Sequence, residues 1–106
     1  MQIAIINGPN LNLLGKRETD IYGHEDFDAF FAQLKSKYDQ IDLSYYRSNA
    51  EGEIVSKIQE IGFQVDGIII NPAAYSHTSI AIRDAISSIK SPVMEVHISN
   101  IYQREE

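Results

Sequence analysis

The chain of 106 residues contains no cysteine and no tryptophan, and it has only three prolines. Without cysteine, a disulfide scaffold, a thiolate metal site and a cysteine nucleophile are all excluded. Long apolar runs are also missing, because stretches such as residues 68–70 are far too short to cross a bilayer. The first residues lack the basic segment and apolar core of a signal peptide. We therefore expect a cytoplasmic protein that has no membrane partner.

Basic residues are scarce as well. Nine Lys and Arg residues stand against fifteen Asp and Glu residues, which gives a formal net charge of −6. A negative surface repels nucleic acid, so we expect no nucleic-acid partner. An anionic metabolite is not excluded, since a pocket can be locally positive within an acidic protein. The hydrophobic content of 43% is typical of a globular protein, and the length predicts one small domain.

Strand and helix patterns alternate along the chain. Short apolar, β-branched runs predict strands at residues 2–7, 41–46, 67–70 and 93–98. Helical spacing predicts helices at residues 25–38, 51–61 and from Thr78 or Ser79 to about Ile89, with Gly62 capping the second. The first helix should bury one aromatic face, made of Phe27, Phe30, Phe31, Leu34 and Tyr38. The third strand is apolar throughout and should be covered on both faces.

This alternating order predicts an α/β fold, specifically a flavodoxin-like three-layer sandwich with a parallel sheet in the order 2-1-3-4. Residues 1–106 are interpreted as a single flavodoxin-like catalytic domain. A fourth helix and a fifth strand would be expected after the last residue. The domain is therefore interpreted as incomplete at its C-terminus.

Ligands of open parallel sheets bind beyond the carboxyl ends of the strands, where the strand order reverses. Here that point lies between the first and third strands, which are followed by the polar loops 8–23 and 71–77. The fourth strand should bring further polar residues to the same edge. The side chains expected there are Asn10, Arg17, Tyr22, Asn71, His77, His97 and Ser99. This convergence predicts an enzyme site.

Three segments carry a more specific signal. They are residues 7–15 (NGPNLNLLG) with the following RE and IYG, residues 71–79 (NPAAYSHTS) with AIRDA after them, and residues 95–100 (EVHISN) followed by REE. Together and in this order, they resemble the signatures of the type II 3-dehydroquinate dehydratases, or type II dehydroquinases. The family continues with a further arginine, a last strand and a last helix, and this chain does not contain them.

The resemblance implies an anti elimination that converts 3-dehydroquinate to 3-dehydroshikimate through an enolate, without cofactor, metal or Schiff base. It places the reaction in the shikimate pathway of aromatic amino acid biosynthesis. Tyr22 matches the family's base, and Arg17 matches the cation that favours its phenolate, since a free phenol has a pKa of about 10. His97 matches the acid that protonates the leaving hydroxyl. Asn10 matches the residue that helps to position an enolate-stabilising water.

The resemblance also implies a substrate-binding set, which comprises Asn71, His77, Ile98 and Ser99. The backbone N–H groups of Ile98 and Ser99 would bind the substrate carboxylate, assisted by the Ser99 hydroxyl and the Asn71 amide. His77 would bind a ring hydroxyl. Asp84 matches a residue that acts across a subunit interface, because the family packs trimers into dodecamers. Asn7 and Asn12 are interpreted as structural, and residues 15–23 as a mobile lid.

Three alternatives stay open at this stage. A flavin or nucleotide module would need a Ser, Thr and Gly-rich loop after the first strand, whereas residues 8–11 (GPNL) offer little of this. The second alternative is a phosphoreceiver or partner-binding domain. A receiver would need paired acidic residues at the end of the first strand and an Asp at the end of the third, and Asn7 and Asn71 stand there instead. The third alternative is an inactive fragment of the dehydroquinase family.

Overall fold

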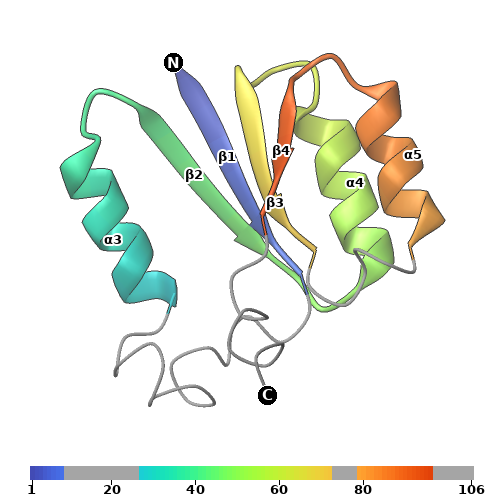
Figure 1. The fold of residues 1–106 in the computed structure, drawn as a ribbon, viewed down its shortest axis with the longest axis horizontal. Coiled ribbons are helices and arrows are strands. Elements are labelled where there is room, and N and C mark those ends of the chain that lie inside the picture. The colour runs from blue at the N-terminus through green and yellow to red at the C-terminus, as the bar shows by residue number, and fades with distance from the viewer. Residues whose placement is uncertain (9–26, 73–78, 97–106) are drawn as a thin grey trace, which may run out of the picture.

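The computed structural model describes residues 1–8, 27–72 and 79–96. Its centre is a parallel sheet in the order β2-β1-β3-β4, as Figure 1 shows. The strands are β1 (Gln2–Asn7), β2 (Asp42–Arg47), β3 (Gly67–Asn71) and β4 (Val93–Glu95). The predicted α/β class and strand order are confirmed. The fourth strand was expected to continue through residue 98, and residues beyond 96 lie outside the described part.

The described residues form helices on both faces of this sheet. Helix α3 (Phe27–Lys37) lies on one side, and α4 (Glu51–Ile61) and α5 (Ile80–Ser88) lie on the other (Figure 1). The predicted three layers are therefore present. Gly62 caps α4, since its N–H donates to the Ile58 carbonyl at 2.8 Å. Ser79 caps α5, because its Oγ accepts the Ile82 N–H at 3.0 Å. None of the described helices is long and apolar enough to cross a membrane.

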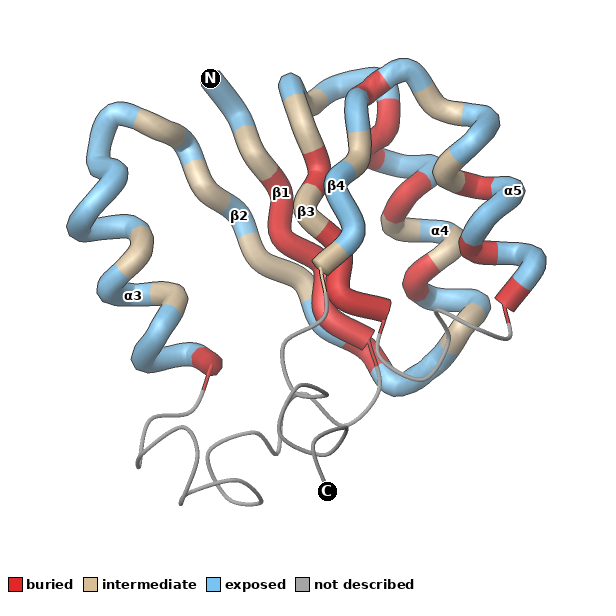
Figure 2. Tube along the Cα trace, in the orientation of Figure 1, coloured by how far each residue is buried: buried red, intermediate tan, exposed pale blue. Residues whose placement is uncertain are grey.

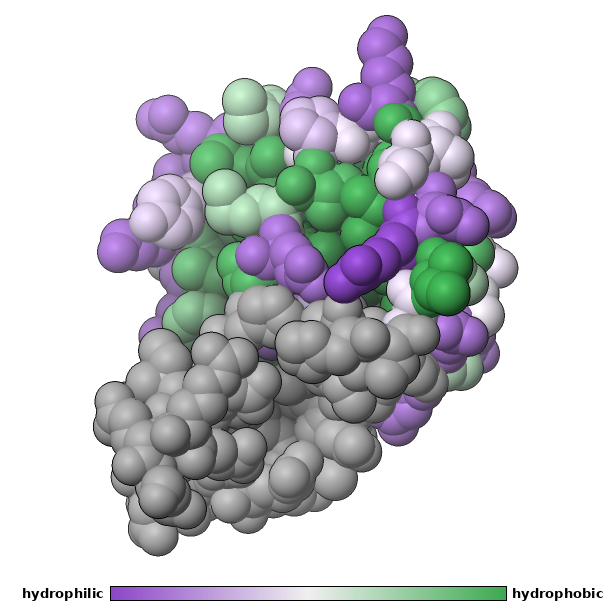
Figure 3. All heavy atoms as spheres, turned by 45° about the vertical axis from the view of Figure 1, so that its right-hand side comes forward, coloured by the Kyte–Doolittle hydropathy of each residue, from purple (hydrophilic) through white to green (hydrophobic). Residues whose placement is uncertain are grey.

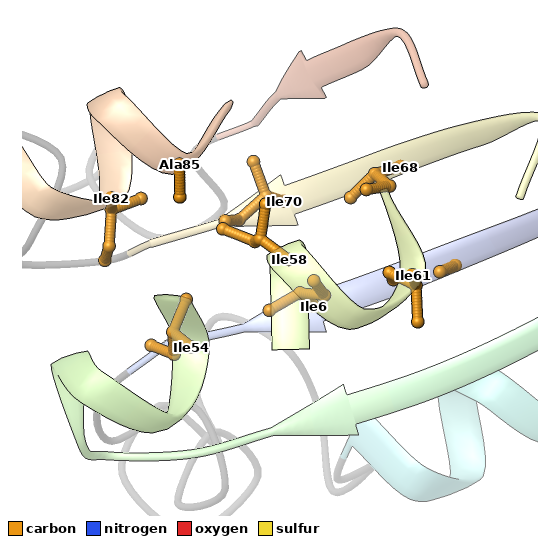
Figure 4. Close-up of a cluster of buried hydrophobic side chains, with 9 residues drawn as sticks. Ile6, Ile54, Ile58, Ile61, Ile68, Ile70, Ile82 and Ala85 are labelled. Carbon is orange, nitrogen blue, oxygen red and sulfur yellow. The ribbon is translucent and has the colours of Figure 1, made fainter. Parts of the chain in front are cut away.

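The core lies between the sheet and the pair α4 and α5. Strand alternation sends every second residue of β1 and β3 to this face, and helical spacing turns one isoleucine stripe of α4 toward it. Figure 4 shows these side chains meeting, and the tube in Figure 2 is red mainly along the same elements. The cluster consists of Ala4, Ile6, Ile54, Ile58, Ile61, Ile68, Ile70, Ile82 and Ala85. Burying each isoleucine contributes roughly 1.5–3 kcal/mol.

The α3 side is packed less completely than the sequence pattern predicts. Within α3 only Phe27 is buried, while Phe30 is 43% exposed. Tyr38, just past the helix, is 45% exposed. The helix contacts the sheet through Tyr45 of β2, with ring centroids 4.8 Å from Phe27 and 5.3 Å from Phe31. The predicted aromatic face is therefore only partly buried, because α3 lies against the edge strand and not across the whole sheet.

On the same side, an apolar groove of about 550 Å³ runs from α3 to β4. Its lining includes Ile3, Leu34, Leu43, Ile69 and Met94, and Met94 is 64% exposed. In Figure 3, which turns the side of α4 and α5 forward, apolar side chains gather at the centre of the visible face. The expectation that both faces of β3 are covered is wrong for the described residues. Only the α4 and α5 side has helices packed over β3.

Candidate active site

Three neighbouring strands end in polar residues at the same level. Asn7 of β1 pairs with Arg47 of β2 on one side and with Asn71 of β3 on the other. Partners in parallel register project their side chains to the same face of the sheet. Ile5 and Ile69 lie two residues earlier on the same face, and both line the apolar groove on the α3 side. The three polar side chains therefore lie on the α3 side of the carboxyl edge. This is the point at which the strand order reverses.

Backbone hydrogen bonds hold this edge together beyond the strands. The Gly8 N–H donates to the Asn71 carbonyl at 2.7 Å, and the Ser48 N–H donates to the Asn7 carbonyl at 3.1 Å. A Cβ on Gly8 would lie 2.6 Å from the Pro72 carbonyl oxygen. A glycine after β1 is therefore required for the close approach of the chain that leaves β3.

Both asparagines of this edge are buried. Asn7 is 1% exposed and Asn71 is 3% exposed, whereas Arg47 is exposed. Tyr45 projects to the same face two residues before Arg47. Burial raises the pKa of the Tyr45 hydroxyl, and the neighbouring Asn7 amide and Arg47 guanidinium offset part of this rise. The phenol is thus neutral near physiological pH and can donate or accept a hydrogen bond.

A second polar surface lies where β2 runs into α4. A cleft of about 330 Å³ is lined by Arg47, Ser48, Asn49, Ala50 and Glu53. The Ser48 hydroxyl donates to the Glu53 carboxylate and accepts the Ala50 N–H at 3.0 Å. These bonds fix the chain at the start of α4, so Arg47 projects from a rigid corner next to the buried asparagines.

Two of the predicted site residues fall within the described part. Asn71 lies at the switch point between β1 and β3, which is where the sequence predicted it. Asp84 is exposed on α5, and it lies on the other side of the sheet from the Asn71 side chain. The fold does not bring these two residues together within one chain.

The other predicted site residues lie outside the described residues, as does the predicted lid at 15–23. They are Asn10, Arg17, Tyr22, His77, His97, Ile98 and Ser99. Within residues 1–8, 27–72 and 79–96, no group of three or more His, Asp or Glu side chains could hold a metal ion.

Sequence reasoning left Tyr45 and Arg47 out of the site and interpreted Asn7 as structural. Two signals were present. The first and third strands both end on asparagine, and in parallel neighbours such matching ends lie side by side. The second strand ends with Tyr45 and Arg47 two residues apart, which the period of a strand projects to one face.

The whole chain matches a known family. The sequence profile described as "Dehydroquinase class II" matches residues 1–106. The chain belongs to the class II dehydroquinase family. Among its relatives, the "3-dehydroquinate dehydratase" of Aliarcobacter butzleri is 57% identical over all of this chain, and that of Campylobacter lari is 55% identical. The chain spans 66% and 68% of the length of these two relatives.

Solved structures of the family share the fold described above. The type II dehydroquinase of Butyrivibrio crossotus is 49% identical, with a TM-score of 0.87 over 98% of this chain and 74% of its own. That of Propionibacterium acnes is 40% identical, with a TM-score of 0.83 over 99% of this chain and 74% of its own. Membership in this family decides against the flavin module and the phosphoreceiver. The asparagines that end β1 and β3 are consistent with that decision.

Proposed function

We propose that this class II dehydroquinase dehydrates 3-dehydroquinate to 3-dehydroshikimate in the shikimate pathway. The observation that carries the proposal is the match of all 106 residues to the family, together with relatives above 50% identity that are called 3-dehydroquinate dehydratase. The buried asparagine at the end of β3 supports it, because it lies at the edge where an open parallel sheet binds its ligand.

Tyr22 is proposed as the base. Its phenolate removes the proton from the carbon next to the ketone, and the charge moves onto the ketone oxygen as an enolate. A phenolate is scarce near neutral pH, since the ordinary pKa is about 10. Arg17 is proposed to favour it, because a guanidinium stays charged and cannot compete for the proton. This base is consumed and regenerated once in each turnover.

His97 is proposed as the acid. As the enolate collapses, the carbon–oxygen bond to the leaving hydroxyl breaks, and the imidazolium gives that oxygen a proton so that it departs as water. Asn10 is proposed to position the water that stabilises the enolate oxygen. An amide suits this task, since it orients a dipole without losing a proton.

Substrate binding is proposed for Asn71, which ends β3, and for residues that follow β3 and β4 in the sequence. The Asn71 amide, the His77 ring and the N–H groups of Ile98 and Ser99 are proposed to bind the hydroxyls and the carboxylate. Asp84 is exposed on α5, away from Asn71, so we propose that it serves a neighbouring subunit. That role fits an assembly of trimers packed into a dodecamer. We further propose that the enzyme acts in the cytoplasm.

The reaction is tested by adding 3-dehydroquinate and following the ultraviolet absorbance of the conjugated product. Tyr22→Phe and His97→Ala should each lower kcat by about 10²- to 10⁴-fold, as expected for a missing base or acid. Tyr38→Phe is the matched control, because Tyr38 is 45% exposed just past α3, and it should keep full turnover. Borohydride should trap no adduct. Wild-type turnover by Tyr22→Phe would refute the base assignment, and a wild-type chain without any turnover would favour the inactive-fragment alternative.

A further inference from the structure

Two polar atoms of the carboxyl edge are buried without a hydrogen-bond partner. Within the described part of the chain, these are Asn7 Nδ2 and Tyr45 Oη. The Asn7 amide and the Arg47 guanidinium lie close enough to Tyr45 to lower the pKa of its hydroxyl, but neither makes a hydrogen bond of ordinary length and angle with it. Asn7 as a residue is 1% exposed. A buried donor or hydroxyl that makes no hydrogen bond costs roughly 1–3 kcal/mol, and such atoms are rare in folded proteins. A pair of them at one place therefore calls for a physical reason.

The pair occupies one position in the fold. Asn7 and Tyr45 come from neighbouring strands and project to the α3 face, since Asn7 pairs with Arg47 and Tyr45 pairs with Ile5. The Tyr45 ring is fixed by Phe27 and Phe31, so its hydroxyl has little freedom to seek another partner. On the other side of Asn7 stands Asn71, which the proposed function assigns to substrate binding.

The chemistry of the two free groups selects the ligand atom. An amide N–H can only donate, whereas a neutral phenol can donate or accept. A hydroxyl or water oxygen can bind both groups. It accepts a hydrogen bond from the amide N–H, and it either donates a second one to the phenol oxygen or accepts one from the phenol O–H. A carboxylate fits less well, because both groups are buried and Arg47, the cation beside Tyr45 in the described part of the chain, is exposed.

We infer that Asn7 and Tyr45 together bind one hydroxyl oxygen beside Asn71, either a ring hydroxyl of the substrate or a water beneath it. This inference rests on the proposed function, and it adds two positioning residues that sequence reasoning did not assign. The two unpaired atoms then lower the stability of the ligand-free protein and gain a hydrogen-bond partner when the oxygen is bound, as happens where activity and stability compete.

The test uses Tyr45→Phe in the full chain, since this change deletes one oxygen and leaves the packed ring. If the hydroxyl is merely unpaired, its removal leaves activity unchanged and leaves the unfolding midpoint unchanged or raised. If it binds the hydroxyl oxygen, kcat/KM falls roughly tenfold, as for the loss of one hydrogen bond, without loss of stability. Tyr46→Phe is the matched control, because Tyr46 is on the opposite face, where it packs against the core and lies 5.2 Å from Lys57.

Asn7→Ala and the double variant sharpen the result. Because both groups bond the same oxygen, the double variant should lose about as much as either single variant and not the product of the two losses. Should Asn7→Ala fail to fold, Tyr45→Phe alone decides. Calorimetry with a non-reacting analogue, whose ketone is reduced to an alcohol, shows whether the bound oxygen belongs to a substrate hydroxyl or to a water. Weaker binding by Tyr45→Phe identifies a substrate hydroxyl, and unchanged binding with a lower kcat identifies a water.

Wild-type turnover and wild-type analogue affinity in Tyr45→Phe, measured beside an active parent enzyme, would overturn the inference and leave the proposed function intact. An inactive parent enzyme would instead count against the proposed function. In that case weaker binding of the analogue by Tyr45→Phe than by the parent still supports a bound substrate hydroxyl, and equal affinities exclude one.

Discussion

Adding a single methyl group at Gly8 tests whether the close approach of the chains that leave β1 and β3 is needed. The added Cβ would lie 2.6 Å from the Pro72 carbonyl oxygen and 2.8 Å from its carbon. Both are backbone atoms, so no side-chain rotation can relieve the contact. Ordinary contact begins at 3.4 Å, and the two chains must therefore separate by about 0.8 Å.

That separation has a calculable cost. The hydrogen bond from Gly8 N–H to the Asn71 carbonyl, now 2.7 Å, would lengthen toward about 3.5 Å and weaken. Weakening it costs up to roughly 0.5–1.5 kcal/mol, and overpacking adds about 1–3 kcal/mol. We expect Gly8→Ala to lower the free energy of unfolding by about 2–4 kcal/mol. Because a misplacement near 1 Å can slow a reaction about 10²-fold, kcat/KM should fall by up to that factor.

The assay is urea unfolding followed by circular dichroism, beside the turnover measurement. Gly52→Ala is the matched control, since nothing lies within 4 Å of its added Cβ on α4. In a helix this change should stabilise by about 0.5–1 kcal/mol, so the two alanines should act with opposite signs. A Gly8→Ala protein as stable and as active as the parent would refute the close-approach argument.

Two further predictions concern a helix cap and a buried phenol. Ser79→Ala should lower the free energy of unfolding by about 1 kcal/mol, because its Oγ accepts the Ile82 N–H at 3.0 Å. Ser87→Ala, at an exposed site of the same helix, should change it by less than about 0.5 kcal/mol. Equal effects in urea titrations would contradict the capping role. Burial raises the pKa of Tyr45 above 10.0, so the folded chain holds that proton more tightly and stability falls as pH rises above this value. The fall should be shallower in Tyr45→Phe, and an unchanged slope of the unfolding midpoint against pH would argue against the raised pKa.

Local sequence signals predicted the elements well where one face of each element is strongly apolar. Helix α4 begins and ends at the predicted residues, because its isoleucines recur at helical spacing and Gly62 follows directly. Strand β1 also has its predicted bounds. The prediction was weaker for α3, where Phe30 and Tyr38 fit the apolar pattern and are nevertheless exposed. Periodicity shows which residues share a face, but it does not show how far the sheet extends beneath them.

The residues of the candidate site also fall into those that the sequence identified and those that only the structure identified. Motif resemblance selected Asn71, and the fold confirms its position beside β1 at the switch point. Asn7 and Tyr45 carried no motif signal for the site, because an asparagine at a strand end and a tyrosine within a strand are both common. Their importance depends on a shared face and on buried atoms without partners, which are properties of two strands far apart in the sequence.

The sequence by itself determined the α/β class, the strand order, the helix caps and the family, because periodicity, capping residues and motifs are local or linear properties of the chain. Only the tertiary structure decided which polar side chains meet at the carboxyl edge, how closely Gly8 must approach Pro72, and which face of β3 has helices packed over it in the described residues. Those outcomes depend on register and on packing between distant segments. No single stretch of sequence encodes them, since each is set by the partner that the fold brings alongside.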